Sequence, residues 1–171
     1  PAPADKTLPG RGVTFCDFDQ DGDMDAFVSN YRLAPNGLWV NDGKGKFEDK
    51  AKDLGAAGNL EGKRGIKNGN GLSYPCAGHT IGSAWADFDN DLWFDLLVGN
   101  FSHPPEWQDR VQLLKNDGGK TFVDKSAAAK VRWQESYAGA CCGDLDNDGR
   151  GDFFIPAVYP NDRGVVYANQ G

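Results

Sequence analysis

The stretch CDFDQDGDMDAF, residues 16 to 27, places five aspartates within nine positions and then continues directly into apolar residues. The carboxylates belong to Asp17, Asp19, Asp21, Asp23 and Asp25. Like charges this close repel one another unless an opposite charge lies among them. The stretch therefore predicts a bound cation.

The same pattern occurs twice more along the chain. Aligned on their first Asp, the three segments read DFDQDGDMD from Asp17, DFDNDLWFD from Asp87 and DLDNDGRGD from Asp144. All three carry Asp at positions 1, 3, 5 and 9, and they begin 70 and then 57 residues apart. Repetition of this length predicts an array of similar supersecondary units.

The alignment continues on both sides of each Asp cluster. Three glycines lie five residues before the first Asp of a cluster: Gly12, Gly82 and Gly139. An apolar run follows each cluster, and a second short run then ends in an asparagine: Asn41, Asn116 and Asn169. Two copies continue through a glycine turn to Phe47 and Phe122. Such runs and turns predict small antiparallel sheets, which must stack on one another to bury their faces.

The spacing of the aspartates is suited to calcium. Side-chain oxygens at positions 1, 3 and 5 of a tight loop can turn inward, and a carbonyl at position 7 and an Asp at position 9 can complete the shell. Hard, anionic oxygen ligands favour Ca²⁺ over softer transition metals. We expect three Ca²⁺ sites with these ligands: Asp17, Asp19, Asp21, Asp23 and Asp25; Asp87, Asp89, Asp91, Trp93 and Asp95; Asp144, Asp146, Asp148, Arg150 and Asp152. Asp23, Trp93 and Arg150 are expected to contribute backbone carbonyls.

Two other interpretations of the loops fit the sequence less well. An EF-hand needs a bidentate Glu at position 12 and flanking helices, whereas position 12 here is Val28, Val98 or Ile155 within β-type runs. A single Asp-rich turn could instead cap itself through side-chain hydrogen bonds, but three matched loops argue against that. The second loop departs from the pattern because Leu92 replaces the glycine found at Gly22 and Gly149.

These features together resemble the FG-GAP/VCBS repeats of integrin-like β-propellers. The residues that carry the resemblance are the glycine before each loop, D-x-D-x-D-G-x-x-D, the apolar strand, and LWVNDGKGKF at residues 38–47. The N-D-G tail is similar to that of secreted proteins related to cartilage acidic proteins. The resemblance covers most of the chain outside residues 53–78. It implies four-stranded blades around an axis, each stiffened by one Ca²⁺.

The expected fold is therefore all-β, a partial β-propeller of about two and a half to three four-stranded blades, each with an Asp-rich calcium loop. We expect one domain over residues 1–171, with blade units at 10–55, 79–130 and 135–171, the last incomplete, and a Gly-rich insertion at 56–78. So few blades do not close a ring. Either the chain is a fragment of a longer protein, or other subunits supply the remaining blades.

Several smaller features carry expectations of their own. An even number of cysteines suits an oxidising compartment, and we expect a disulfide from Cys76 to Cys141 or Cys142, with buried free thiols as the alternative. Asn100-Phe101-Ser102 is a formal N-glycosylation sequon. Trp107 lies in a variable loop and is the tryptophan best placed for a binding surface.

Charge and composition narrow the function. A net charge of −7 argues against nucleic acid as a partner, and no apolar stretch is long enough to span a membrane. We expect a secreted, extracellular or periplasmic module that binds a protein or a glycan, or that serves as a structural subunit of an extracellular assembly. The alternative is a fragment of a polysaccharide lyase or hydrolase. Outside the loops no convincing catalytic carboxylate pair is evident, so we do not expect an enzyme.

Overall fold

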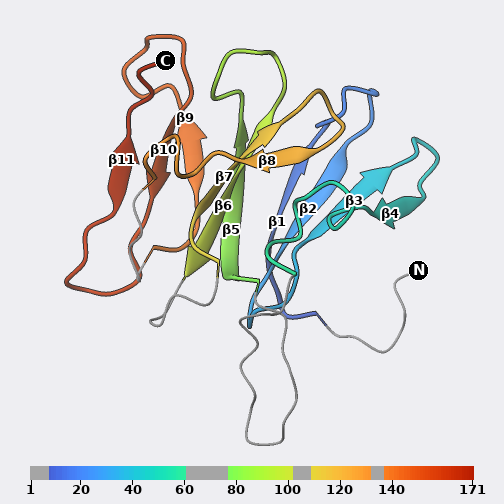
Figure 1. Ribbon diagram of the computed structural model, residues 1–171, viewed down its shortest axis with the longest axis horizontal. Coiled ribbons are helices and arrows are strands. Elements are labelled where there is room, and N and C mark those ends of the chain that lie inside the picture. The colour runs from blue at the N-terminus through green and yellow to red at the C-terminus, as the bar shows by residue number, and fades with distance from the viewer. Residues whose placement is uncertain (1–7, 61–76, 102–108, 132–136) are drawn as a thin grey trace, which may run out of the picture.

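Three antiparallel sheets make up the computed structural model, which describes residues 8–60, 77–101, 109–131 and 137–171 (Figure 1). Every element within these ranges is a strand, and no helix in them could cross a membrane. The expected all-β architecture is confirmed. The sheets do not close on one another, and the number of propeller blades stays a prediction.

Each sheet follows the order of its strands along the chain. The first contains β1 (Gly10–Cys16), β2 (Asp25–Asn30), β3 (Gly37–Asn41) and β4 (Phe47–Asp49). The second contains β5 (His79–Ala86), β6 (Asp95–Phe101), β7 (Gln112–Asn116) and β8 (Phe122–Asp124). The third contains β9 (Cys141–Gly143), β10 (Asp152–Ile155) and β11 (Val165–Tyr167), with β10 in the centre. These are the meanders that the repeated apolar runs predicted.

The sheets stack through two apolar layers, and the second sheet contributes to both. In β6, Leu96 and Val98 pack with Phe27 and Leu38 of the first sheet, whereas Leu97 packs with Phe153 of the third. Successive side chains of a strand point to opposite faces, so a strand between two apolar layers buries both of its faces. This explains why every residue of β6 is buried.

The glycine row before the loops lets the first strands of the sheets approach closely. A Cβ added at Gly12 would lie 3.0 Å from the carbonyl oxygen of Ile81, and one at Gly82 would lie 3.2 Å from the Cα of Gly139. Strand β1 accordingly lies against β5, and β5 against β9. The repeated glycine therefore sets the spacing between neighbouring sheets.

The start of the Gly-rich insertion is packed. Ala56 and Ala57 are buried in the layer between the first two sheets, and Leu60 packs against it. The backbone of Leu54 also accepts a hydrogen bond of 2.7 Å from Phe122 of β8. Residues 61–76 of the insertion lie outside the described residues, as does Trp107.

The cysteines do not form the expected disulfide. Among the described residues, Cys16, Cys141 and Cys142 are free thiols, and Cys76 lies outside those residues. The Cys142 thiol instead donates a 2.9 Å hydrogen bond to the carbonyl of Trp85 in the second sheet. Burial, with the nearby charge of Asp17, raises the pKa of the Cys16 thiol to about 12, which keeps it protonated and unreactive.

The sequon asparagine is a core residue. The Asn100 side chain is 1% exposed, donates to the carbonyl of Arg110 and accepts a hydrogen bond from the Thr80 hydroxyl. Ser102, the third residue of the sequon, lies outside the described residues. A glycan could be attached at Asn100 only by breaking these buried hydrogen bonds, so the folded sheet disfavours use of the sequon.

Candidate metal centres

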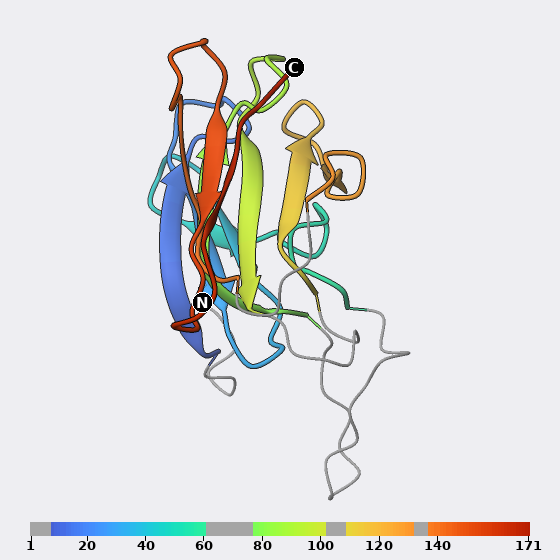
Figure 2. The ribbon, with the colours of Figure 1, turned by 90° about the vertical axis from the view of Figure 1, so that its left-hand side faces the viewer.

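The three Asp-rich loops lie at the same end of the stacked sheets, and both views agree on this (Figures 1 and 2). Each loop joins the first two strands of its sheet. The strand register places the ninth-position Asp directly opposite the residue before the first-position Asp: Cys16 with Asp25, Ala86 with Asp95, and Gly143 with Asp152. The antiparallel pairing therefore brings the two ends of each cluster together.

The first-position aspartates shape the loops. Asp17 accepts hydrogen bonds of 3.1 Å from the backbone N–H groups of Asp21 and Gly22, and Asp87 and Asp144 accept the corresponding pairs in their loops. Both carboxylate oxygens are thus used to fold the chain around the first position. Residues at position 4 have positive φ in all three loops: Gln20, Asn90 and Asn147.

The ninth-position aspartates join each loop to the far side of its sheet. They accept hydrogen bonds of 2.8 Å from the backbone N–H groups of the asparagines that end the second apolar run of each repeat, Asn41, Asn116 and Asn169. The second oxygens of Asp95 and Asp152 accept from position 2 of their own loops, Phe88 and Leu145. All three ninth-position side chains are at most 2% exposed.

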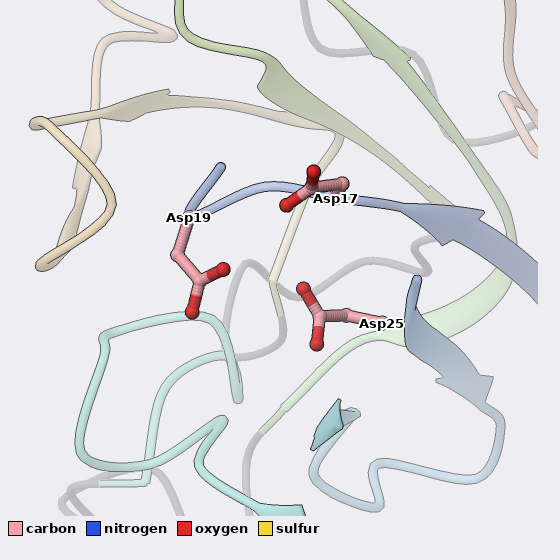
Figure 3. Close-up of side chains that lie close together, drawn as sticks. All are labelled: Asp17, Asp19 and Asp25. Carbon is pink, nitrogen blue, oxygen red and sulfur yellow. The ribbon is translucent and has the colours of Figure 1, made fainter. Parts of the chain in front are cut away.

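The first, third and ninth positions converge in every loop. One carboxylate oxygen from each of Asp17, Asp19 and Asp25 lies within 4.8 Å of the other two, and these side chains face a common space (Figure 3). The same holds for the sets of Asp87, Asp89 and Asp95, and of Asp144, Asp146 and Asp152. Nine of the fifteen expected ligands are therefore brought together in three matched groups.

The first loop contains two buried oxygens that accept no hydrogen bond from the described part of the chain. Asp19 Oδ1 and Asp25 Oδ2 are both buried without a hydrogen-bond partner. Burial raises the pKa of Asp25 to about 6 and raises that of Asp19, whose neighbour Asp21 adds to the effect. Buried carboxylate oxygens without partners are costly. A hard cation held among Asp17, Asp19 and Asp25 would supply the missing partner, so the donor set fits Ca²⁺.

The fifth-position aspartates lie outside the converging groups and have a different contact. Asp21, Asp91 and Asp148 each accept a hydrogen bond of 2.9 to 3.0 Å from the backbone N–H of position 7. In the third loop, the other oxygen of Asp148 is held by the Arg150 guanidinium. A metal contact from position 5, and the carbonyl contacts expected from Asp23, Trp93 and Arg150, stay predictions.

The second loop keeps its shape despite the missing glycine. Leu92 has φ +73°, close to the +96° of Gly22 and the +85° of Gly149. Its side chain is 80% exposed. Two hydrogen bonds hold the strained residue in place. The Leu92 backbone N–H donates to the Asp87 carboxylate, and the Gln20 side-chain amide donates to the Leu92 carbonyl. The loop therefore bends as its siblings do, at the expense of backbone strain.

Sequence reasoning missed two kinds of residue at these centres. The asparagines were noticed as strand ends, but their side chains also connect neighbouring loops: Asn116 Nδ2 donates to Phe18 O, and Asn169 Nδ2 to Phe88 O. No motif in the sequence assigns Lys115 to a loop, although its ammonium contacts Asp89 and Asp91. Its position immediately before a repeated asparagine was the available signal, because the siblings Val40 and Ala168 are uncharged.

Residues 87–155 match the family model of the FG-GAP-like repeat. This FG-GAP-like segment runs from the first Asp of the second loop to the end of β10, and it includes the second and third loops. The resemblance drawn from the sequence is confirmed.

A curated relative extends the similarity beyond the FG-GAP-like segment. Cartilage acidic protein 1 from Xenopus tropicalis is 27% identical over 143 residues, which is 84% of this chain and 19% of that protein. The chain thus spans about a fifth of the length of the curated relative it matches. The similarity therefore covers much of the chain, whereas the relative contains a great deal that this chain does not.

Proposed function

We propose that this chain is a secreted, calcium-stabilised β-propeller module that binds a protein or a glycan, or acts as a structural subunit of an extracellular assembly. The observation that carries the proposal lies in the first loop, where Asp19 Oδ1 and Asp25 Oδ2 are buried next to Asp17 and have no hydrogen-bond partner among the described residues. The FG-GAP-like match and a relative named for cartilage support an extracellular, non-enzymatic role.

Calcium would act here on the fold. Asp17, Asp19 and Asp25 would hold the ion in the first loop, and Asp144, Asp146 and Asp152 in the third. The bound ion would neutralise carboxylates that otherwise repel one another. A ligand that binds only the folded state stabilises it by about 2.7 kcal/mol per site when its free concentration is about 100 times the Kd.

Exposed apolar side chains support the proposal that further blades or subunits pack on this array. Val13 and Phe15 of β1 are 52% and 58% exposed. They alternate with Thr14, whose hydroxyl lies 2.8 Å from that of Ser83, so they face away from the second sheet. Val166 of β11 is exposed to a similar extent on the third sheet. Exposed apolar faces on the two outer sheets favour stacking with further units of the same kind.

Calcium removal tests the proposal. We expect EDTA to lower the Tm in differential scanning calorimetry, and added Ca²⁺ but not Mg²⁺ to restore it, because flexible multi-carboxylate loops favour the larger ion. A Tm that is the same in EDTA and in excess Ca²⁺ would contradict the assignment.

A matched pair of variants locates the ion. Asp25→Asn keeps the acceptor for Asn41 N–H but removes the buried charge, so we expect one fewer Ca²⁺ by isothermal titration calorimetry. In EDTA the same variant should be at least as stable as the wild type, because it relieves an unpaired buried carboxylate. Asp23→Asn is the control, since position 7 is expected to contribute only its carbonyl, and it should leave the stoichiometry unchanged.

A further inference from the structure

Lys115 separates the second loop from its siblings. Its ammonium lies 2.7 Å from Asp91 Oδ2 and also contacts Asp89 Oδ2, and Asp89 belongs to the converging group with Asp87 and Asp95. The lysine is partly enclosed, with its side chain 29% exposed. The cation therefore lies against Asp89, one of the three carboxylates that a metal in this loop would use.

The equivalent positions in the other sheets carry no charge. Lys115 pairs with Val123 of β8 as Val40 pairs with Glu48 of β4, and each residue precedes the asparagine that binds the ninth-position Asp. In the third sheet, Ala168 precedes Asn169. A lysine stem long enough to reach the loop therefore occurs in one of three otherwise matched positions.

The hydrogen bonding of the third- and ninth-position carboxylates differs between the first and second loops, although Asp152 of the third loop, like Asp95, accepts backbone hydrogen bonds at both oxygens. In the first loop, the third- and ninth-position oxygens Asp19 Oδ1 and Asp25 Oδ2 are buried without a partner. In the second loop, both oxygens of Asp95 accept backbone hydrogen bonds, and Asp89 has the lysine. Among the described residues, no cation contacts the oxygens of Asp19 and Asp25 in the first loop, whereas Lys115 contacts Asp89 in the second.

We propose that the Lys115 ammonium is the resident cation of the second loop, so that this loop takes up Ca²⁺ only when the lysine is displaced, and far more weakly than the first loop. The inference rests on the proposed calcium binding of the sibling loops. Calcium affinity in acidic loops depends on ligand charge, and a lysine that must be displaced and left unpaired should weaken it by about tenfold or more.

Removing the lysine tests the inference with Ca²⁺ as the only probe. Titration of the wild-type chain should show Ca²⁺ binding in the first and third loops and a clearly weaker event in the second. Lys115→Met keeps the aliphatic stem and should strengthen the weak event by about tenfold or more. Adding Asp89→Asn to that variant should abolish the gained binding, which assigns it to the second loop. Lys52→Met, at an exposed lysine away from the loops, should leave the titration unchanged.

Thermal stability gives an independent readout. In EDTA, Lys115→Met should melt below the wild type because Asp89 and Asp91 lose their counter-charge, and saturating Ca²⁺ should reverse the deficit. Lys115→Val introduces the residue found at the equivalent position 40 of the first sheet. It should show the same loss of Tm in EDTA and the same recovery in Ca²⁺, which would exclude an effect specific to methionine.

The outcomes separate this inference from the proposed function. Three sites of equal affinity in the wild type, or a folded Lys115→Met chain with no gain in Ca²⁺ binding, would overturn the inference and leave the proposed function standing. Gain of one site in Lys115→Met, with no binding to the wild type, would overturn calcium binding by the first and third loops, and with it the comparison of the second loop with the first. No binding to either chain would overturn both.

Discussion

Asp25 shows how one side chain serves both the fold and the metal centre. One oxygen accepts the Asn41 N–H and fixes the end of β3, and the other is buried without a partner next to Asp19. Asp95 and Asp152 repeat the first contact in their own sheets. The ninth position therefore closes the loop onto its sheet whether or not a metal is held.

Leu92 carries a measurable backbone strain. It has φ +73° and is 80% exposed, so Leu92→Gly loses little apolar contact and removes an unfavourable conformation. We expect the variant to raise the free energy of unfolding, in urea titrations, by up to about 1 kcal/mol.

The opposite substitution provides the control. At Gly22, where φ is +96° and a Cβ would meet nothing within 4 Å, Gly22→Ala should lower the free energy of unfolding by about 1 kcal/mol through backbone strain alone. A loss of stability in Leu92→Gly would show that the leucine side chain makes a contact that outweighs the strain.

The strands and loops could be predicted well from the sequence because their signals are local. The spacing of Asp within each cluster, the apolar runs and the glycine turns all lie within one unit, and the sheets form where these patterns place them. The roles of Asn116 and Lys115 could not be predicted in this way. Both side chains make contacts with residues that are distant in sequence. Asn116 donates to Phe18, 98 residues earlier, and Lys115 of β7 contacts Asp91 in the loop between β5 and β6.

Asn116 is the residue that ties the second sheet to the first loop. Its side chain is fully buried and donates to Phe18 O and Phe94 O, at 2.8 and 3.1 Å, while its oxygen accepts from Gly119 N–H. Asn116→Ala leaves buried carbonyls without donors, and we expect it to lower the free energy of unfolding by about 2 to 4 kcal/mol. Chemical denaturation measures this.

Asn41 offers a comparison for that loss. It is less buried, and its side-chain amide donates to Met24 O of its own loop at 3.3 Å. Asn41→Ala should therefore have the smaller effect on the unfolding free energy. Equal losses in the two variants would mean that the bond between sheets adds nothing to stability.

The stacking of the three sheets depends on how closely their first strands, β1, β5 and β9, approach one another. The sequence showed the glycine row, but only the stacked sheets explain it, because Gly12 and Gly82 each face the following unit. The number of blades and the partners of the exposed faces could not be predicted from the sequence repeats, because the repeats determine only the contacts within and between these three sheets. The spacing set by Gly82 can be tested directly.

Gly82→Ala should separate β5 from the segment around Gly139, since the new Cβ would lie 3.2 Å from its Cα. We expect a loss of about 1 to 3 kcal/mol in the free energy of unfolding. Gly143→Ala, where a Cβ would meet nothing within 4 Å, should differ little from the wild type. Hydrogen exchange should show faster opening of β9 in Gly82→Ala and not in Gly143→Ala.

The asparagine bonds also give the array a direction in time. Asn116 binds a carbonyl of the loop that was synthesised before it, and Asn169 does the same one unit later. During translation, domains fold as the chain emerges from its N-terminal end. Each newly synthesised unit can therefore dock onto a loop that has already folded and that presents the acceptor carbonyl. The units thus leave the ribosome in the order in which these hydrogen bonds can form.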